Sequence, residues 1–82
     1  MHLQDDFQTF IKMIIFYSAH ARENIRKRKI ELIWIKEILK FPDLLIRKGR
    51  FKFHAIKKLN GKTLKIVFMK KRHIKVITLF WI

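Results

Sequence analysis

The chain has 82 residues, which is the length of one domain with a modest core. Half of the residues are hydrophobic and 13% are aromatic, which excludes a disordered chain, and the absence of cysteine excludes disulfides and thiolate metal sites. The formal net charge is +14, and the 6 Asp and Glu leave little material for a Mg²⁺ or Ca²⁺ site, so we expect neither a metal nor a cofactor.

Residues 1–12 are predicted to be an N-terminal extension and residues 13–82 a single domain, because regular patterning begins at Met13. Asp5 and Asp6 precede the first apolar run, which is unlike the start of a signal peptide. No apolar run approaches the roughly 18 residues that a membrane-spanning helix needs. We therefore expect a cytoplasmic protein without a membrane partner.

Two helices are predicted after a short strand over residues 13–17. Ser18 is placed to cap the first helix, residues 19–29, whose apolar stripe consists of Ala21 and Ile25. The second helix covers residues 30–40 and ends at Pro42, since proline disfavours a helical residue before it. Its apolar stripe is broader and consists of Trp34, Ile35, Ile38 and Leu39, extended by Phe41.

The rest of the chain alternates as β-strands do. Residues 44–46 open the sheet, and a strand follows over residues 50–58. One face of that strand carries Phe51, Phe53 and Ala55, and the other carries Arg50, Lys52 and His54. Asn60-Gly61 is the pair that a two-residue hairpin turn prefers. The next strand carries Leu64, Ile66 and Phe68 on one face, and residues 74–82 are apolar on both faces.

This order, β-α-α-β-β-β, predicts an α+β fold in which a helical hairpin packs on a mostly antiparallel sheet. Residues 44–82 contain twelve Lys or Arg and no Asp or Glu. A sheet with this composition has a strong positive field, which favours phosphates or an acidic protein as its partner. No Gly-rich phosphate loop, nucleophile elbow or pair of carboxylates supports a conventional hydrolase or kinase.

The helix start at residues 17–22, Tyr-Ser-Ala-His-Ala-Arg, and the later helix stop at Phe41-Pro42 resemble a small family of unknown function. That family is similar to the BrnT branch of the RelE/ParE-like toxins, and the resemblance covers about residues 13–82. It implies the toxin of a toxin–antitoxin pair, which acts on RNA or the ribosome and is bound by an acidic antitoxin. By the same resemblance, His20, Arg22 and Arg28 lie in the family's polar motif.

Metal-independent RNA cleavage needs a general base, a general acid and cations that stabilise the developing charge. The positive end of the helix dipole favours a neutral, base-competent imidazole at His20, and His54 shares a strand face with cations. The predicted catalytic residues are His20, Arg28, Arg50 and His54. The predicted nucleic-acid-binding residues are Arg22, Arg26, Lys52, Lys65, Lys70, Lys71, Arg72 and Lys75. Alternatively, His20 fixes the helix start, His54 is simply exposed, and the basic face of the first helix is solvated.

Three hypotheses are consistent with these patterns. The first is an RNA-cleaving or ribosome-directed toxin with an acidic antitoxin. The second is a non-catalytic module that binds nucleic acid through the basic sheet. The third is a protein-interaction module, such as a homodimer, that pairs through the apolar end of the last strand, residues 79–82.

Overall fold

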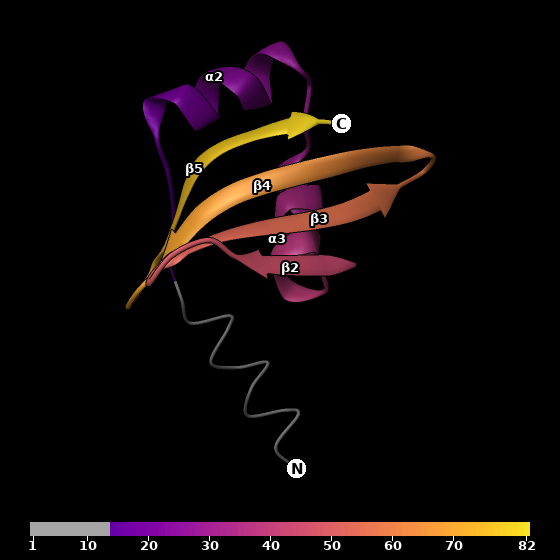
Figure 1. Ribbon diagram of the computed structural model, residues 1–82. Helices are drawn as coiled ribbons and strands as arrows, with labels where there is room; N and C mark the ends of the chain where they lie inside the picture. Colours follow the sequence, from indigo (N-terminus) through magenta and orange to yellow (C-terminus); the bar gives the residue numbers. More distant parts are fainter. Residues whose placement is uncertain (1–13) are drawn as a thin grey trace.

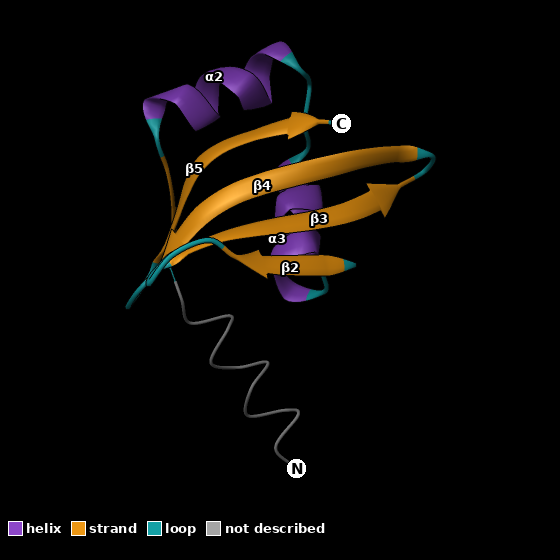
Figure 2. Ribbon diagram, in the orientation of Figure 1, coloured by secondary structure: helices purple, strands orange, loops and turns teal. Residues whose placement is uncertain are grey.

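The computed structural model describes residues 14–82, which fold into two helices and a five-stranded sheet (Figures 1 and 2). The predicted extension over residues 1–12 lies outside the described residues. The elements in chain order are β1 (Ile15–Tyr17), α2 (Ala19–Lys27), α3 (Leu32–Lys40), β2 (Leu44–Arg47), β3 (Lys52–Leu59), β4 (Lys62–Lys70) and β5 (Ile74–Trp81).

The sheet has the strand order β1-β5-β4-β3-β2. β1 runs parallel to β5, and the other neighbouring pairs are antiparallel. The predicted α+β class is therefore confirmed. One more strand follows the helices than the predicted order contains, because residues 44–47 form the edge strand β2, which a turn at residues 48–51 separates from β3.

Ser18 caps α2 and also fastens the helix to the sheet. Its Oγ accepts a hydrogen bond from the amide of Ala21 at 3.0 Å and donates one to the carbonyl of Ile77 at 2.6 Å. The helix ends at Lys27, two residues earlier than predicted. It stops because Lys29 adopts a left-handed conformation with φ of 53°, which a continuing right-handed helix does not allow.

α3 ends just before Pro42, as predicted. Ile35 and Ile38 are buried in the core, with Trp34 and Leu39 packed against them. The prediction that Phe41 extends this stripe is wrong, because its side chain is 62% exposed. The chain leaves helical geometry at Phe41, where φ is −133°, so the spacing of 3.6 residues per turn no longer applies there.

The two helices cover different parts of the sheet. In Figure 1, α3 crosses behind the sheet and α2 lies beside β5. The core lies on the face that α3 covers, and its fully buried side chains include Ile35, Ile38, Leu64, Ile66, Val76 and Leu79. Because strand side chains alternate, the opposite face presents the other set of residues. We call it the open face, and it carries Phe16, Leu44, Ile46, Lys52, His54, Ile56, Lys65, Val67, Met69, Lys75, Thr78 and Phe80.

The hairpin between β3 and β4 turns at Asn60 and Gly61, as predicted. Both residues have positive φ, 49° and 84°, which is the conformation of a two-residue turn that matches the twist of its strands. A Cβ atom at Gly61 would have no neighbour within 4 Å. Any cost of a side chain there would therefore be conformational and not steric.

We expect Gly61→Ala to lower the free energy of unfolding by about 1 kcal/mol, because a left-handed backbone conformation is less favourable for alanine than for glycine. Gly49→Ala is the matched control, since its Cβ would lie 3.7 Å from that of Lys52, an ordinary contact. Urea unfolding of both variants measures the difference. Equal losses would show that the turn conformation does not set the cost.

Candidate nucleic-acid interface

Two turns that are distant in the sequence meet at one end of the sheet. Residues 48–51 connect β2 to β3, and residues 71–73 connect β4 to β5, and both lie at the left-hand end in Figure 2. The amide of Lys70 donates a hydrogen bond to the carbonyl of Phe51 at 2.8 Å, which joins them. This end gathers seven exposed cations, which we call the turn cluster: Lys48, Arg50, Lys52, Lys70, Lys71, Arg72 and Lys75.

Arg47 holds the first of these turns in shape. Its guanidinium donates from Nε to the carbonyl of Gly49 at 3.1 Å and from an Nη to the carbonyl of Arg50 at 3.0 Å. The amides of Lys48 and Gly49 both donate to the carbonyl of Lys52. Because the guanidinium of Arg47 donates these hydrogen bonds within its own turn, we infer that Arg47 positions the turn cluster and does not bind a ligand.

No carboxylate follows Asp43 in the chain, so the strands from β2 onward carry no acid. Asp43 accepts a hydrogen bond from the amide of Lys58 at 2.9 Å and lies 3.6 Å from Lys57 Nζ. The backbone hydrogen bond, and next the charge of Lys57, lower the pKa of Asp43 below its ordinary 3.8. The negative charge of Asp43 therefore interacts with Lys57 and Lys58 of β3 and does not neutralise the cations of the turn cluster.

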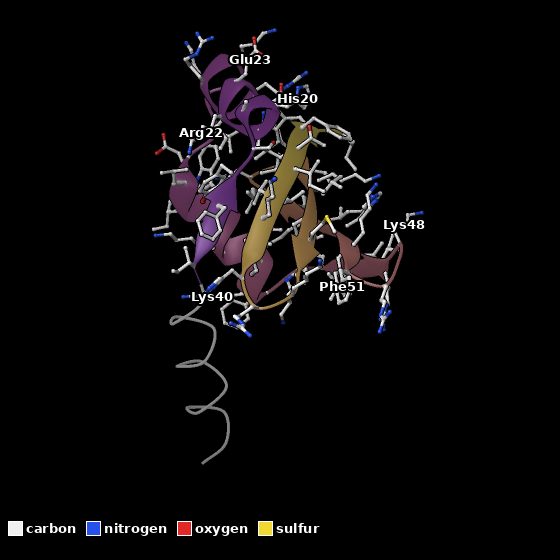
Figure 3. The ribbon with its side chains drawn as sticks, turned by 90° about the vertical axis from the view of Figure 1, so that its left-hand side faces the viewer. His20, Arg22, Glu23, Lys40, Lys48 and Phe51 are labelled. Carbon is white, nitrogen blue, oxygen red and sulfur yellow. The ribbon has the colours of Figure 1, made fainter. Side chains whose placement is uncertain are left out.

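A row of side chains crosses the middle of the open face. Ile46, His54, Val67 and Thr78 face one another on the successive strands β2, β3, β4 and β5. Asn24 of α2 continues the row, because its Nδ2 donates to Thr78 Oγ1 at 3.1 Å. The same Nδ2 lies 3.4 Å from His20 Nε2. His20 itself is exposed, and Figure 3 shows it on the opposite side of α2 from Arg22.

Sequence reasoning missed Asn24, which is 8% exposed. A signal was present, because Asn24 follows Ala21 by three residues and therefore falls within the buried stripe of α2. A polar residue at such a position needs a hydrogen-bond partner in the interior, which Thr78 supplies.

His54 lies half-buried in the same row. Its Nδ1 is shielded from solvent and has no hydrogen-bond partner among the described residues. Burial lowers the pKa of His54 below its ordinary 6.5, and the charges of Lys65, Lys48 and Lys52 lower it further. Both effects favour the neutral form of the imidazole.

This pKa makes stability depend on pH with a definite sign. The unfolded chain binds a proton at His54 more tightly than the folded chain does. The contribution of His54 to the free energy of unfolding is therefore fully present above pH 6.5, and it is lost as the pH falls below 6.5 toward the lowered pKa. We expect His54→Leu to lose less stability than the wild type between pH 7.5 and pH 5, measured by urea unfolding at both pH values. Asp43 acts only at lower pH, since its pKa lies below 3.8. Identical losses in the two proteins would contradict this assignment.

The structure brings one group of predicted site residues together and separates the other. Six of them lie in the turn cluster: Arg50, Lys52, Lys70, Lys71, Arg72 and Lys75. Lys65 lies further along the open face, with its Nζ 5.9 Å from the centre of the Phe80 ring. Arg22, Arg26 and Arg28 are exposed on α2 or at its C-terminal cap.

The four predicted catalytic residues do not form a compact site. His54 and Thr78 are two strands apart, which is roughly 10 Å, and His20 reaches Thr78 only through Asn24. Arg28 caps the far end of α2, and Arg50 lies in the turn before β3 and not on the strand face predicted for it. Neither arginine lies in the cross-strand row that links the two histidines.

Within residues 14–82, no group of three or more His, Asp or Glu side chains is arranged to hold a metal ion. In the same part of the chain, no helix has the length and apolar character needed to cross a membrane. Fold and site thus define a small α+β domain with a basic, acid-free sheet. Residues 17–81 match DUF4258, a domain of unknown function, and the chain belongs to this family. No curated protein and no solved structure matched the chain.

Proposed function

We propose that this protein binds RNA through the turn cluster, as a non-catalytic nucleic-acid-binding module. The observation that carries the proposal is the convergence of seven exposed cations, four on two hydrogen-bonded turns and three on the adjoining strand ends, with no Asp or Glu on the strands beside them. Lys and Arg in this arrangement neutralise phosphates and release their counterions. The cluster extends from β3 to β5, about 10 Å, which is wider than a single phosphate needs.

The spacing of the histidines favours binding over cleavage. General acid–base catalysis requires the two groups within hydrogen-bond reach of the same reacting site, about 3 Å or one water away. Val67, Thr78 and Asn24 separate His54 from His20 along the cross-strand row. A phosphate held by the turn cluster would not need either of them.

The proposal predicts binding that weakens steeply with salt. The logarithm of the affinity for a single-stranded RNA oligonucleotide should fall linearly with the logarithm of the salt concentration, with a slope of about −0.7 for each phosphate contacted. Fluorescence anisotropy from low to moderate salt measures this slope. Absent binding at low salt, or affinity that does not change with salt, would contradict the proposal.

A second candidate is the toxin of a toxin–antitoxin pair that cleaves RNA or acts at the ribosome. It is favoured by the element order and by the open face, where apolar side chains alternate with Lys52, Lys65 and Lys75. An acidic antitoxin would cover such a face, whereas a second copy of the chain would oppose lysine to lysine. In this candidate His20, Arg28, Arg50 and His54 would supply the proton transfers and the charge stabilisation.

Controlled induction in a bacterial host tests the second candidate. Growth and messenger RNA integrity are followed for the wild type and for the double variant His20→Ala, Arg50→Ala at equal protein level. Growth arrest with cleaved messages, relieved in the variant, would support the toxin. Normal growth and intact messages with abundant soluble wild-type protein would rule against it.

A further inference from the structure

Among the described residues, Phe51 has two cations close to its ring, whereas Phe53, Phe80 and Trp81 have one each. Phe53 stacks on Phe68 with 5.6 Å between ring centres, and Trp34 meets Trp81 edge-on at 6.0 Å. No stacked or edge-on partner ring is recorded for Phe51 among the described residues, and its two cations belong to the turn cluster. Lys71 Nζ lies 4.9 Å from the centre of its ring, and Arg50 Cζ lies 5.5 Å from it.

The backbone around Phe51 is held by hydrogen bonds, and the cationic side chains beside its ring are exposed. The carbonyl of Phe51 accepts the hydrogen bond that joins the two turns, and Arg47 fixes the adjacent carbonyls of Gly49 and Arg50. The ring itself is half-buried, whereas the side chains of Arg50 and Lys71 are exposed. Figure 3 shows Phe51 and Lys48 together at this turn. A ring held in this way loses little entropy when it binds a flat partner.

We propose that Phe51 is a stacking platform for one unpaired base of a single-stranded nucleic acid. Arg50 and Lys71 move from the ring to the phosphates that flank this base, and Arg72 of the same turn adds a third cation. This site rests on the proposed function and adds to it, because it selects single strands over duplexes.

The aromatic ring is the feature that points to a base and not to phosphate alone. Phosphate binding requires cations and gains nothing from a ring between them, whereas every base has a π-face that stacks on an aromatic side chain. In a duplex the faces of the bases are already covered by their neighbours.

The test compares Phe51→Leu, Phe51→Tyr and the wild type on a single-stranded RNA oligonucleotide and on the duplex of the same sequence at one salt concentration. Phe51→Leu should weaken single-strand binding by about 5- to 160-fold, the range of one lost base stack. Phe51→Tyr should retain it, and duplex binding should change little in either variant. Phe41→Leu is the control, since Phe41 is an exposed aromatic at the end of α3, outside the turn cluster.

The outcomes separate this site from the proposed function. Equal losses on single strand and duplex with Phe51→Leu, or no loss on the single strand, would overturn the stacking platform while leaving RNA binding in place. Wild-type protein that binds neither RNA would overturn both. If Phe51→Leu fails to fold by circular dichroism, Phe51→Tyr and an oligonucleotide with one abasic position decide the question. The platform requires that the abasic strand bind the wild type more weakly.

Discussion

Replacing Arg50, Lys71 and Arg72 with alanine together is expected to weaken RNA binding by about 10- to 100-fold at moderate salt. These three exposed cations belong to the two turns that the Lys70–Phe51 hydrogen bond joins. Each phosphate contact that is lost should also make the slope of affinity against salt shallower by about 0.7, so the triple variant should lose about 2 in total. Anisotropy titrations over a salt series measure both quantities.

The matched control removes the same charge from another place. It is the triple variant Arg26→Ala, Lys27→Ala, Arg28→Ala. These residues lie at the C-terminal end of α2, a helix that contacts β5 and β1. Arg26 and Arg28 are also predicted site residues, so the comparison tests both locations. If the two triple variants lose equal affinity and equal slope, net charge alone drives binding, and the turn cluster is not a site.

Ile66→Ala is expected to lower the free energy of unfolding by about 2–5 kcal/mol. Ile66 is fully buried in β4, where it faces Ala55 on β3 and Leu79 on β5. Its loss leaves a cavity in the core that its neighbours on β3 and β5 cannot easily fill. A domain of this size has a total stability of only about 4–12 kcal/mol, so the variant approaches the limit of folding. Urea unfolding followed by tryptophan fluorescence gives the value.

Ile33→Ala is the matched control for this core prediction. The side chain of Ile33 is 69% exposed on α3, so removing it costs little burial. We expect a change within about 0.5 kcal/mol. A loss comparable to that of Ile66→Ala would mean that the face of α3 assigned to solvent is in fact buried.

Local signals in the sequence were sufficient for the start of α2, the end of α3 and the turn between β3 and β4. Ser18 offers a hydroxyl at the right position before a helix, Pro42 cannot follow a helical residue, and Asn60-Gly61 tolerates positive φ. Each of these acts through its own backbone, so no tertiary information is needed. The prediction for Phe41 was wrong because it extended the helical spacing of apolar residues past the end of α3. That spacing does not indicate where the chain leaves the helix.

Pairing between distant segments was not predictable in the same way. Nothing in residues 15–17 indicates that β1 pairs in parallel with residues 74–76 of β5, because both are short apolar runs. The acid-free composition of residues 44–82 predicted a positive sheet. It did not predict that the turns around Phe51 and Lys71 meet, since this depends on the register of β3, β4 and β5.

The candidate catalytic residues show the same limit. His20 and His54 each had a favourable local setting in the sequence, but catalysis depends on the distance between them. That distance is set by the number of strands between β3 and α2 and by the link through Asn24 and Thr78. The fold class could therefore be predicted from the pattern of apolar residues in the sequence. Which residues lie together in the site could not, because this depends on the order of the strands in the sheet.

The most direct test of RNA binding at the turn cluster is a nuclear magnetic resonance titration of ¹⁵N-labelled protein with a single-stranded RNA oligonucleotide. We expect the amide chemical shifts to change most at residues 48–52 and 70–75, the two segments that contain the joined turns. The shifts of α3 should change little. Shift changes confined to α2, or none at RNA concentrations well above that of the protein, would contradict the account.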